Sequence, residues 1–236
     1  MQGCGCSVIV DRMPHLSKLI AVTLLWAAAA AVSAAPPLTE ALQAELDRAV
    51  IDYESGRLDA AGAAFDSLSR RGVPAAQYNL AVMHLRAELP QPDPARALAL
   101  LTQAAEGGFV TAQFMLGQGW ENGQFGRSDL AAALVWYEIA AIAGSADAQV
   151  AMGTAYYLGR GVARKPAEAA RWYREAANAG DVGAQYLLAS MYEQGDGVAL
   201  DVRLARYWYD IAARNGDAAA PGKVRELDAR RAAPSS

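Results

Sequence analysis

The sequence is poor in the residues from which most catalytic and metal sites are built. Its 236 residues include only two cysteines, Cys4 and Cys6, and two histidines, His15 and His84. Two cysteines alone give too few ligands for a zinc site, and histidines this scarce argue against cysteine–histidine pairs and Ser-His-Asp triads. We expect His84 to be a packing residue. The sequence therefore predicts a protein that is not an enzyme, with no catalytic residue, no metal site and no cofactor.

Basic charge and phosphate-binding loops are scarce as well. The formal net charge is −4 and lysines and arginines form no run, which argues against nucleic acid as a partner. The glycine pairs Gly159-x-Gly161 and Gly195-x-Gly197 lie between two predicted helices and recur with the period described below. Turn geometry therefore explains them better than phosphate binding does.

The first 35 residues have the layout of a signal peptide. Basic residues precede an apolar stretch, Leu19–Val32, which is followed by small residues at the −3 and −1 positions of a cleavage site near Ala34 or Ala35. An uncleaved anchor is the alternative, although the apolar stretch is close to the lower length limit for a membrane span. Met13 is an alternative start. The pattern predicts a periplasmic or secreted protein that meets the membrane only through this segment, before cleavage.

The rest of the chain is organised around one glycine that recurs every 36 residues. Five glycines keep this spacing without slippage, and alanine, glutamine, tryptophan and tyrosine recur at fixed distances after them. Self-similarity at this period is typical of stacked-repeat proteins. The glycines are Gly72, Gly108, Gly144, Gly180 and Gly216.

Each unit reads as a helical hairpin, with a helix A, a loop and a helix B. Apolar residues recur at helical spacing before and after a glycine-containing loop. The recurring glycine falls where helix B ends, where a left-handed residue is needed. Small residues at the fourth, ninth and twenty-fifth positions after it are expected to let the helices approach closely.

These spacings give the predicted organisation of the chain. After the signal peptide at 1–35 comes a degenerate N-terminal capping repeat at 36–71, and Pro221-Gly222 is expected to interrupt the unit that begins at Gly216, so that Lys223–Arg231 forms a short capping helix. The four full repeats span 72–107, 108–143, 144–179 and 180–215, and a C-terminal capping helix and tail span 216–236.

The motif residues resemble the Sel-one-like repeat family, a subclass of the tetratricopeptide-like alpha-solenoids. The resemblance implies an all-α fold, a right-handed alpha-alpha superhelix of about five helical hairpins, and a role as an interaction scaffold with helix A on the concave side. The unit that starts at Gly144 carries the pattern as Ala148, Met152-Gly153, Tyr156, Gly159-x-Gly161-Val162, Ala169, Trp172-Tyr173 and Ala176-Ala177.

The helix A face opposite the core is the candidate binding surface. Positions six, ten and thirteen after each glycine vary between repeats and mix aromatic with polar residues, which suits recognition of a protein or peptide. The alternative is that the sixth-position aromatics only bridge adjacent repeats. We expect Glu121 and Glu193 to be solvated carboxylates, too far apart for a glycosidase pair. The candidate binding residues are Tyr78, Phe114, Gln118, Glu121, Thr154, Tyr157, Tyr186, Ser190 and Glu193.

The function that these observations favour is a scaffold for a protein or peptide partner in the cell envelope, in envelope assembly or regulation. Two alternatives stay open. One is a cell-wall-directed enzyme, β-lactamase-like or peptidoglycan-acting, because cysteine-rich members of the resembled family have been linked to penicillin binding. This chain lacks their cysteine pairs. The other is a glycan-binding module that uses the same helix A groove.

Overall fold

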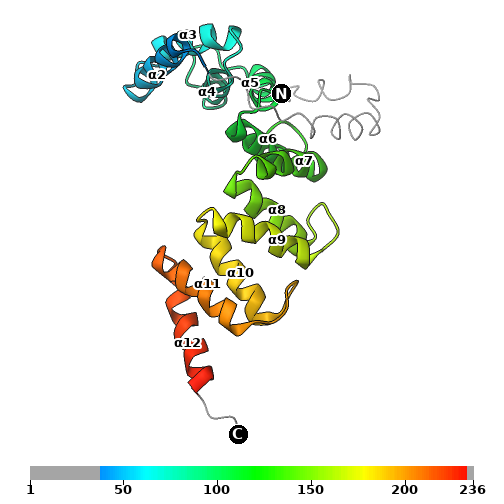
Figure 1. Ribbon diagram of the computed structural model, residues 1–236. Helices are drawn as coiled ribbons and strands as arrows, with labels where there is room; N and C mark the ends of the chain where they lie inside the picture. The colour runs from blue at the N-terminus through cyan, green and yellow to red at the C-terminus, as the bar shows by residue number, and fades with distance from the viewer. Residues whose placement is uncertain (1–37, 233–236) are drawn as a thin grey trace, which may run out of the picture. The chain divides into compact units, whose positions relative to one another are not determined.

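The structure is a computed structural model that describes residues 38–232. The predicted signal peptide, residues 1–35, and the end of the predicted tail lie outside this part. All regular structure between residues 38 and 232 is α-helical, as expected, and it forms two compact units, residues 38–109 with 123–128, and residues 110–122 with 129–232 (Figure 1).

The first unit contains two helical hairpins, α2 with α3 and α4 with α5. The degenerate first hairpin has a core of its own, in which Leu46 and Ala49 of α2 are buried, as are Ala61, Phe65 and Leu68 of α3. Ala61 and Phe65 stand at positions that are also buried in the later repeats, Ala97 and Leu101 among them. The helices of this unit are α2 Glu40–Glu54, α3 Leu58–Arg70, α4 Pro74–Leu85 and α5 Pro94–Glu106.

The second unit repeats the hairpin three times and adds one more helix. Its A helices are α6, α8 and α10, its B helices are α7, α9 and α11, and each helix packs against the next along the chain (Figure 1). The bounds are α6 Val110–Asn122, α7 Leu130–Ile142, α8 Ala146–Leu158, α9 Pro166–Asn178, α10 Val182–Gln194, α11 Val202–Arg214 and α12 Ala220–Ala232.

Aspartates begin most of the B helices. The Asp129 carboxylate accepts from the backbone N–H groups of Ala131 and Ala132 at 3.0 Å, and Asp93 and Asp201 make the same bonds in α5 and α11. These bonds satisfy helix N–H groups that have no partner inside the helix. Lys165 stands at this place before α9 and makes no such bond, because its ammonium group cannot accept a hydrogen bond.

The recurring glycines end the B helices. Gly144, Gly180 and Gly216 have φ of 94°, 97° and 100°, and Gly72 and Gly108 are also left-handed. A side chain is strained in this conformation, whereas glycine is not. The prediction from the 36-residue spacing is thus confirmed by the backbone.

The recurring glutamine closes the step from one repeat to the next. The Gln149 amide on α8 donates to the carbonyl of Ala141, in the last turn of α7, at 3.1 Å. Gln185 on α10 donates to the carbonyl of Ala177 on α9 at 3.2 Å. Both glutamines are buried, and each amide adds a second hydrogen bond to a helix-end carbonyl that already accepts from the N–H of the recurring glycine.

The helix B tyrosine lies against the small ninth residue of helix A. A Cβ placed on Gly117 would be 2.4 Å from the ring of Tyr137, and one on Gly153 would be 2.7 Å from the ring of Tyr173. Such distances are below any tolerable contact, so the two helices pack this closely only because these residues lack a side chain.

Trp172 joins two repeats. It lies on α9, is 5% exposed, and belongs to a cluster with residues of α7 and of α8, among them Ala140 and Met152. The tryptophan of one helix B thus fills space beside the preceding helix B, as expected for an inter-repeat contact.

The C-terminal helix differs from its prediction. Pro221-Gly222 was expected to interrupt the unit, but α12 begins at Ala220 and includes both residues. Proline fits the first helical turn because its missing N–H would have no intrahelical acceptor there. Asp217 accepts from the N–H groups of Ala219 and Ala220 at 2.8 and 2.7 Å and so begins the helix.

Two glycine-to-alanine changes in A helices should have opposite effects on stability. Gly153→Ala should lower the free energy of unfolding by about 1–3 kcal/mol, because the new Cβ displaces the Tyr173 ring. Gly183→Ala should raise it by about 0.5–1 kcal/mol, because its Cβ would meet no backbone or core atom and alanine favours the helix. Equilibrium denaturation measures both, and equal effects would contradict the assigned Gly153–Tyr173 contact.

Trp172→Ala should lower the free energy of unfolding by about 3–5 kcal/mol, the usual cost of removing a large buried side chain. The loss should appear in hydrogen exchange of both α7 and α9, because the contact belongs to two repeats. A loss below about 1 kcal/mol would mean that Trp172 does not bridge the repeats.

Candidate functional site

The sixth-position aromatics lie on other rings. Phe114 of α6 contacts Tyr137 at 5.6 Å between ring centroids, and Tyr186 of α10 contacts Tyr209 at 5.0 Å. In both cases the partner is the helix B tyrosine of the same repeat. Tyr78, in the first unit, contacts Phe109 at 5.2 Å. All three candidate side chains are half-buried, so they contribute to packing and remain partly accessible to solvent.

The tenth-position residues differ in exposure. Gln118 of α6 is exposed. Thr154 of α8 is half-buried and its hydroxyl lies 3.0 Å from the hydroxyl of Tyr173. The hydroxyl of Ser190 accepts from the amide of Gln194 at 3.0 Å. Of these three side chains, that of Gln118 is the most exposed to solvent.

Glu121 is not a simple solvated carboxylate. One oxygen accepts from the hydroxyl of Tyr137 at 2.7 Å, and the other pairs with the Arg160 guanidinium at 2.9 Å. Burial of the tyrosine, together with the bond to Glu121, raises the pKa of Tyr137 well above its usual range. The expectation of a solvated carboxylate is therefore wrong. The partners of Glu121 lie on α7 and in the loop after α8, and the sequence of its own helix does not reveal them.

Glu193 is the equivalent residue of the last full repeat, and it is also not solvated. Its side chain is 9% exposed, accepts from the Tyr209 hydroxyl at 2.9 Å, and pairs with Lys223 at 3.2 Å and Arg230 at 3.4 Å. Burial acts to lower the pKa of Lys223, but its bonds to Glu193 and Glu226 outweigh this and raise the pKa. The two cations come from α12, which closes this end of the unit.

Tyr157 takes the place of the glutamate in the middle repeat. Its ring is half-buried, and the guanidinium of Arg164 lies 5.5 Å from the ring centroid. Without a carboxylate at this position, Tyr173 bonds to Thr154 instead. The thirteenth position is therefore an aromatic residue in the middle repeat of the unit and a paired carboxylate in the repeats before and after it.

A pocket of about 190 Å³ opens beside Glu121. Arg160 borders it because Gly161, with φ of 73°, lets the loop lie on Leu130 and Leu134 of α7, where a Cβ would be 3.0 Å from both. The lining residues are Glu121, Leu130, Ala133, Leu134, Tyr137, Ala151, Thr154, Ala155 and Arg160.

This pocket brings together two of the predicted residues, Glu121 and Thr154. The polar groups beside them, on Tyr137 and Arg160, were not among the candidates. The glycine pair Gly159-x-Gly161 could have indicated the role of Arg160. It lets the loop after α8 lie against the preceding repeat, and this brings the Arg160 guanidinium to Glu121. The remaining candidates lie outside the pocket lining.

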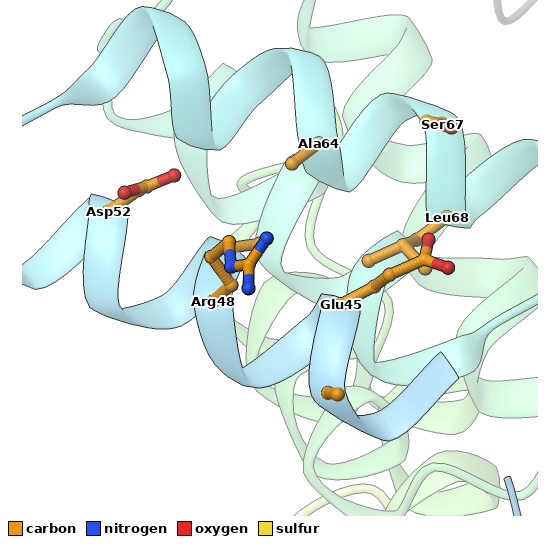
Figure 2. A pocket seen from close by; sticks show the side chains of 8 residues that line it. Glu45, Arg48, Asp52, Ala64, Ser67 and Leu68 are labelled. Atoms are coloured by element: carbon orange, nitrogen blue, oxygen red, sulfur yellow. The ribbon is translucent and has the colours of Figure 1, made fainter. Parts of the chain in front are cut away.

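A second pocket, of about 250 Å³, lies between α2 and α3 in the first unit. Figure 2 shows Arg48 between Asp52 and Glu45 along α2, facing small residues of α3. Glu45 is paired with Arg71, and Asp52 with Arg57 at 2.6 Å. These ion pairs are exposed, so they contribute little to stability. The small side chain of Ala64 stands where the next repeat carries Leu100 and the last three full repeats carry tryptophan.

His84 is a packing residue, as expected. It is 5% exposed, and its Nδ1 accepts from the backbone N–H of Asp93 at 3.1 Å, which ties α4 to the start of α5. Burial, followed by the charge of Arg96, lowers the pKa of His84. Between residues 38 and 232, no group of three or more histidine, cysteine or acidic side chains is arranged so that it could hold a metal ion. The helices of this range are all too short or too polar to cross a bilayer.

Comparison with known families and structures agrees with the observed period. The family model of the Sel1 repeat matches residues 74–109, 110–145, 146–181 and 182–217, so each match starts two residues after a recurring glycine. No curated protein sequence matches the chain closely enough to count as a relative.

Two solved structures are similar over most of the chain. One is a Sel1 repeat protein from Oxalobacter formigenes, with 33% identity and a TM-score of 0.68, over 71% of this chain and 49% of that one. The other is a protective antigen of uropathogenic Escherichia coli with an SLR fold, with 28% identity and a TM-score of 0.75, over 83% of this chain and 43% of that one. The chain thus spans about half the length of these relatives. On the four matched repeats and this likeness, the chain belongs to the Sel1 repeat family.

Proposed function

We propose that this chain is a non-catalytic scaffold that is exported to the periplasm or beyond and binds a protein or peptide partner in the cell envelope. Sel1 repeats generally mediate protein–protein interaction. The export part of the proposal rests on the signal-peptide pattern of residues 1–35.

The pocket beside Glu121 is the observation that supports binding by the second unit. The core positions of its repeats are alike, with Tyr137, Tyr173 and Tyr209 all buried. The thirteenth position varies from Glu121 to Tyr157, and Glu121 borders an open pocket. A partner that recognises this unit must contact what differs between repeats, and an open pocket with a few convergent polar groups is the usual form of such a site.

The alternatives have less support. Glu121 is held by a tyrosine and one arginine, and Glu193 by a tyrosine and two cations, so neither is arranged as the protonated acid of a hydrolase. A glycan site is expected to present exposed aromatic faces, whereas Phe114 and Tyr186 pack on other rings.

Filling the pocket should prevent partner capture. Ala151→Trp places an indole in the pocket, and we expect the yield of crosslinked partner from native envelopes to fall about tenfold, as for loss of a central interface contact. Quantitative mass spectrometry of the crosslinked material measures this. Ala167→Trp, at an exposed position of α9 outside the pocket, is the matched control and should keep the wild-type yield.

Equal capture by both variants would place the binding surface elsewhere. No enrichment of any envelope protein over an unrelated bait would contradict the scaffold proposal itself. Circular dichroism of both variants checks that the helices are retained.

The mature protein should begin at Ala35 or Pro36. N-terminal sequencing of the protein purified from its native cells tests this, with cell fractionation to locate it. A membrane-bound chain that keeps Leu19–Val32 would instead establish the anchor alternative.

A further inference from the structure

We propose that the pocket between α2 and α3 receives a tryptophan side chain of the partner. The inference rests on the proposed function for the class of partner, a protein or peptide. It adds a site in the first unit and the residue that this site recognises. It comes from a comparison with the hairpin of α8 and α9, where the chain fills the equivalent place with a tryptophan of its own.

One helix B position carries a large apolar side chain in each hairpin from α4–α5 to α10–α11. Trp172 of α9 is 5% exposed there, and its cluster includes Ala148 and Met152 of its own helix A and residues of the preceding helix B. At the same position α3 has Ala64, which is half-buried. The equivalent residues of the later hairpins are Leu100, Trp136, Trp172 and Trp208.

The walls of the pocket correspond to the surroundings of Trp172. The connection between α2 and α3 has three residues, 55–57, whereas that between α8 and α9 has seven, 159–165, so helix A of the first hairpin is displaced by four residues in the repeat register. Ala49 then takes the place of Gly153, and both are buried. In this register three lining residues, Ala44, Arg48 and Asp52, stand where the Trp172 cluster has Ala148, Met152 and Tyr156.

The pocket has room and apolar surface for an aromatic ring. Its volume is about 250 Å³, and the buried side chains of Ala49 and Leu68 form part of its wall. A cavity of about 150 Å³ lined by apolar side chains binds benzene, so the larger pocket can receive an aromatic side chain. Ile51, one turn along α2 from Arg48, is 56% exposed, so apolar surface continues beyond the lining residues.

Arg48 is a lining residue whose charge is not engaged by a carboxylate. Glu45 is paired with Arg71, whose hydrogen bond holds the pKa of Glu45 below its usual range, and Asp52 is paired with Arg57 at 2.6 Å. Within residues 38–232 the Arg48 side chain forms no ion pair and no hydrogen bond, although Figure 2 shows it between these two acids. A guanidinium in this state can stack on the face of an aromatic ring.

The charges of the first hairpin favour a neutral aromatic ring over an acidic ligand. From residue 40 to residue 71 the chain has seven acidic and four basic residues, and this excess repels a carboxylate. The chain already combines a guanidinium with the equivalent tryptophan, since that of Arg171 lies 4.6 Å from the centroid of the Trp172 ring. Tryptophan attracts a cation more strongly than tyrosine or phenylalanine does, so we assign tryptophan to the pocket.

The first test supplies the tryptophan from outside. The ¹⁵N-labelled full mature chain is titrated with a blocked pentapeptide that carries one central tryptophan between glycines, and with matched cyclohexylalanine, glutamate and lysine peptides. Saturable shifts of the Ala44 and Ala64 amides are expected with tryptophan, at a Kd roughly two- to fivefold lower than with cyclohexylalanine, because only the aromatic ring attracts the guanidinium. No shift with tryptophan, or equal or tighter binding of a matched peptide, overturns the proposal.

The second test changes the pocket and repeats the titration with the tryptophan peptide. Ala64→Trp places an indole of the chain itself in the pocket and should abolish the shift of the Ala44 amide. Ala63→Trp, at an exposed neighbouring position outside the lining, is the matched control and should keep the wild-type Kd. Arg48→Gln should raise the Kd roughly two- to fivefold, because the amide carries no charge.

Binding that survives Ala64→Trp, or that is unchanged by Arg48→Gln, overturns the proposal. Circular dichroism checks that each variant keeps its helices. If Ala64→Trp loses them, Arg48→Gln decides alone, because Arg48 is exposed and its replacement leaves the core intact.

The partner-capture assay separates this inference from the proposed function. If the wild-type chain captures an envelope protein but does not bind the tryptophan peptide, only the present inference fails. If the peptide binds as expected but no envelope protein is captured, the proposed function fails and the pocket between α2 and α3 remains a tryptophan site.

Discussion

The packing of one tyrosine against one small residue sets the distance between the two helices of each repeat in the second unit. Gly117 and Gly153 accept the rings of Tyr137 and Tyr173 at distances that leave no room for a side chain. In the last repeat Ala189 takes this place and Tyr209 remains fully buried. Because the ring is fixed, its hydroxyl reaches the tenth or the thirteenth position of helix A, at Thr154 in the middle repeat and at Glu121 and Glu193 in the other two. The repeat thus delivers a polar group to the surface as a by-product of its core.

The fixed tyrosine hydroxyl favours a hydrogen-bond acceptor at the thirteenth position. A glutamate at this position accepts the hydrogen bond of the tyrosine and can also pair with cations. Tyr157 does not bond to the Tyr173 hydroxyl, which lies against Thr154 instead. A carboxylate this close to the core keeps its charge only with compensating donors. The chain supplies such donors to Glu193 from α12, and to Glu121 from α7 and from the loop after α8. The two equivalent carboxylates are thus paired with cations from different elements of the chain.

Much of the fold could be predicted from the sequence, because its period, caps and left-handed glycines are local features. The missing cap at Lys165 and the helix ends at the recurring glycines needed only neighbouring residues. The partners of Glu121 could not be predicted in the same way, because they come from helix B and from the next repeat. Nor could the start of α12, where Pro221 reads as a helix breaker unless the N-cap bonds of Asp217 are known.

The same reasoning explains why membership of the Sel1 repeat family determines the fold of this chain more closely than its partner. The family pattern consists of positions that are buried or that bend the backbone, such as the alanine pairs and the loop glycines. Ala151 and Lys223 occupy one place in that pattern, which is only partly buried, and Ala151 packs against the edge of a core cluster. A partly buried position restricts its side chain less than a fully buried one, and successive repeats carry alanine, leucine and lysine there, at Ala151, Leu187 and Lys223. In an array of nearly equal units, positions of this kind are where one repeat differs from the next.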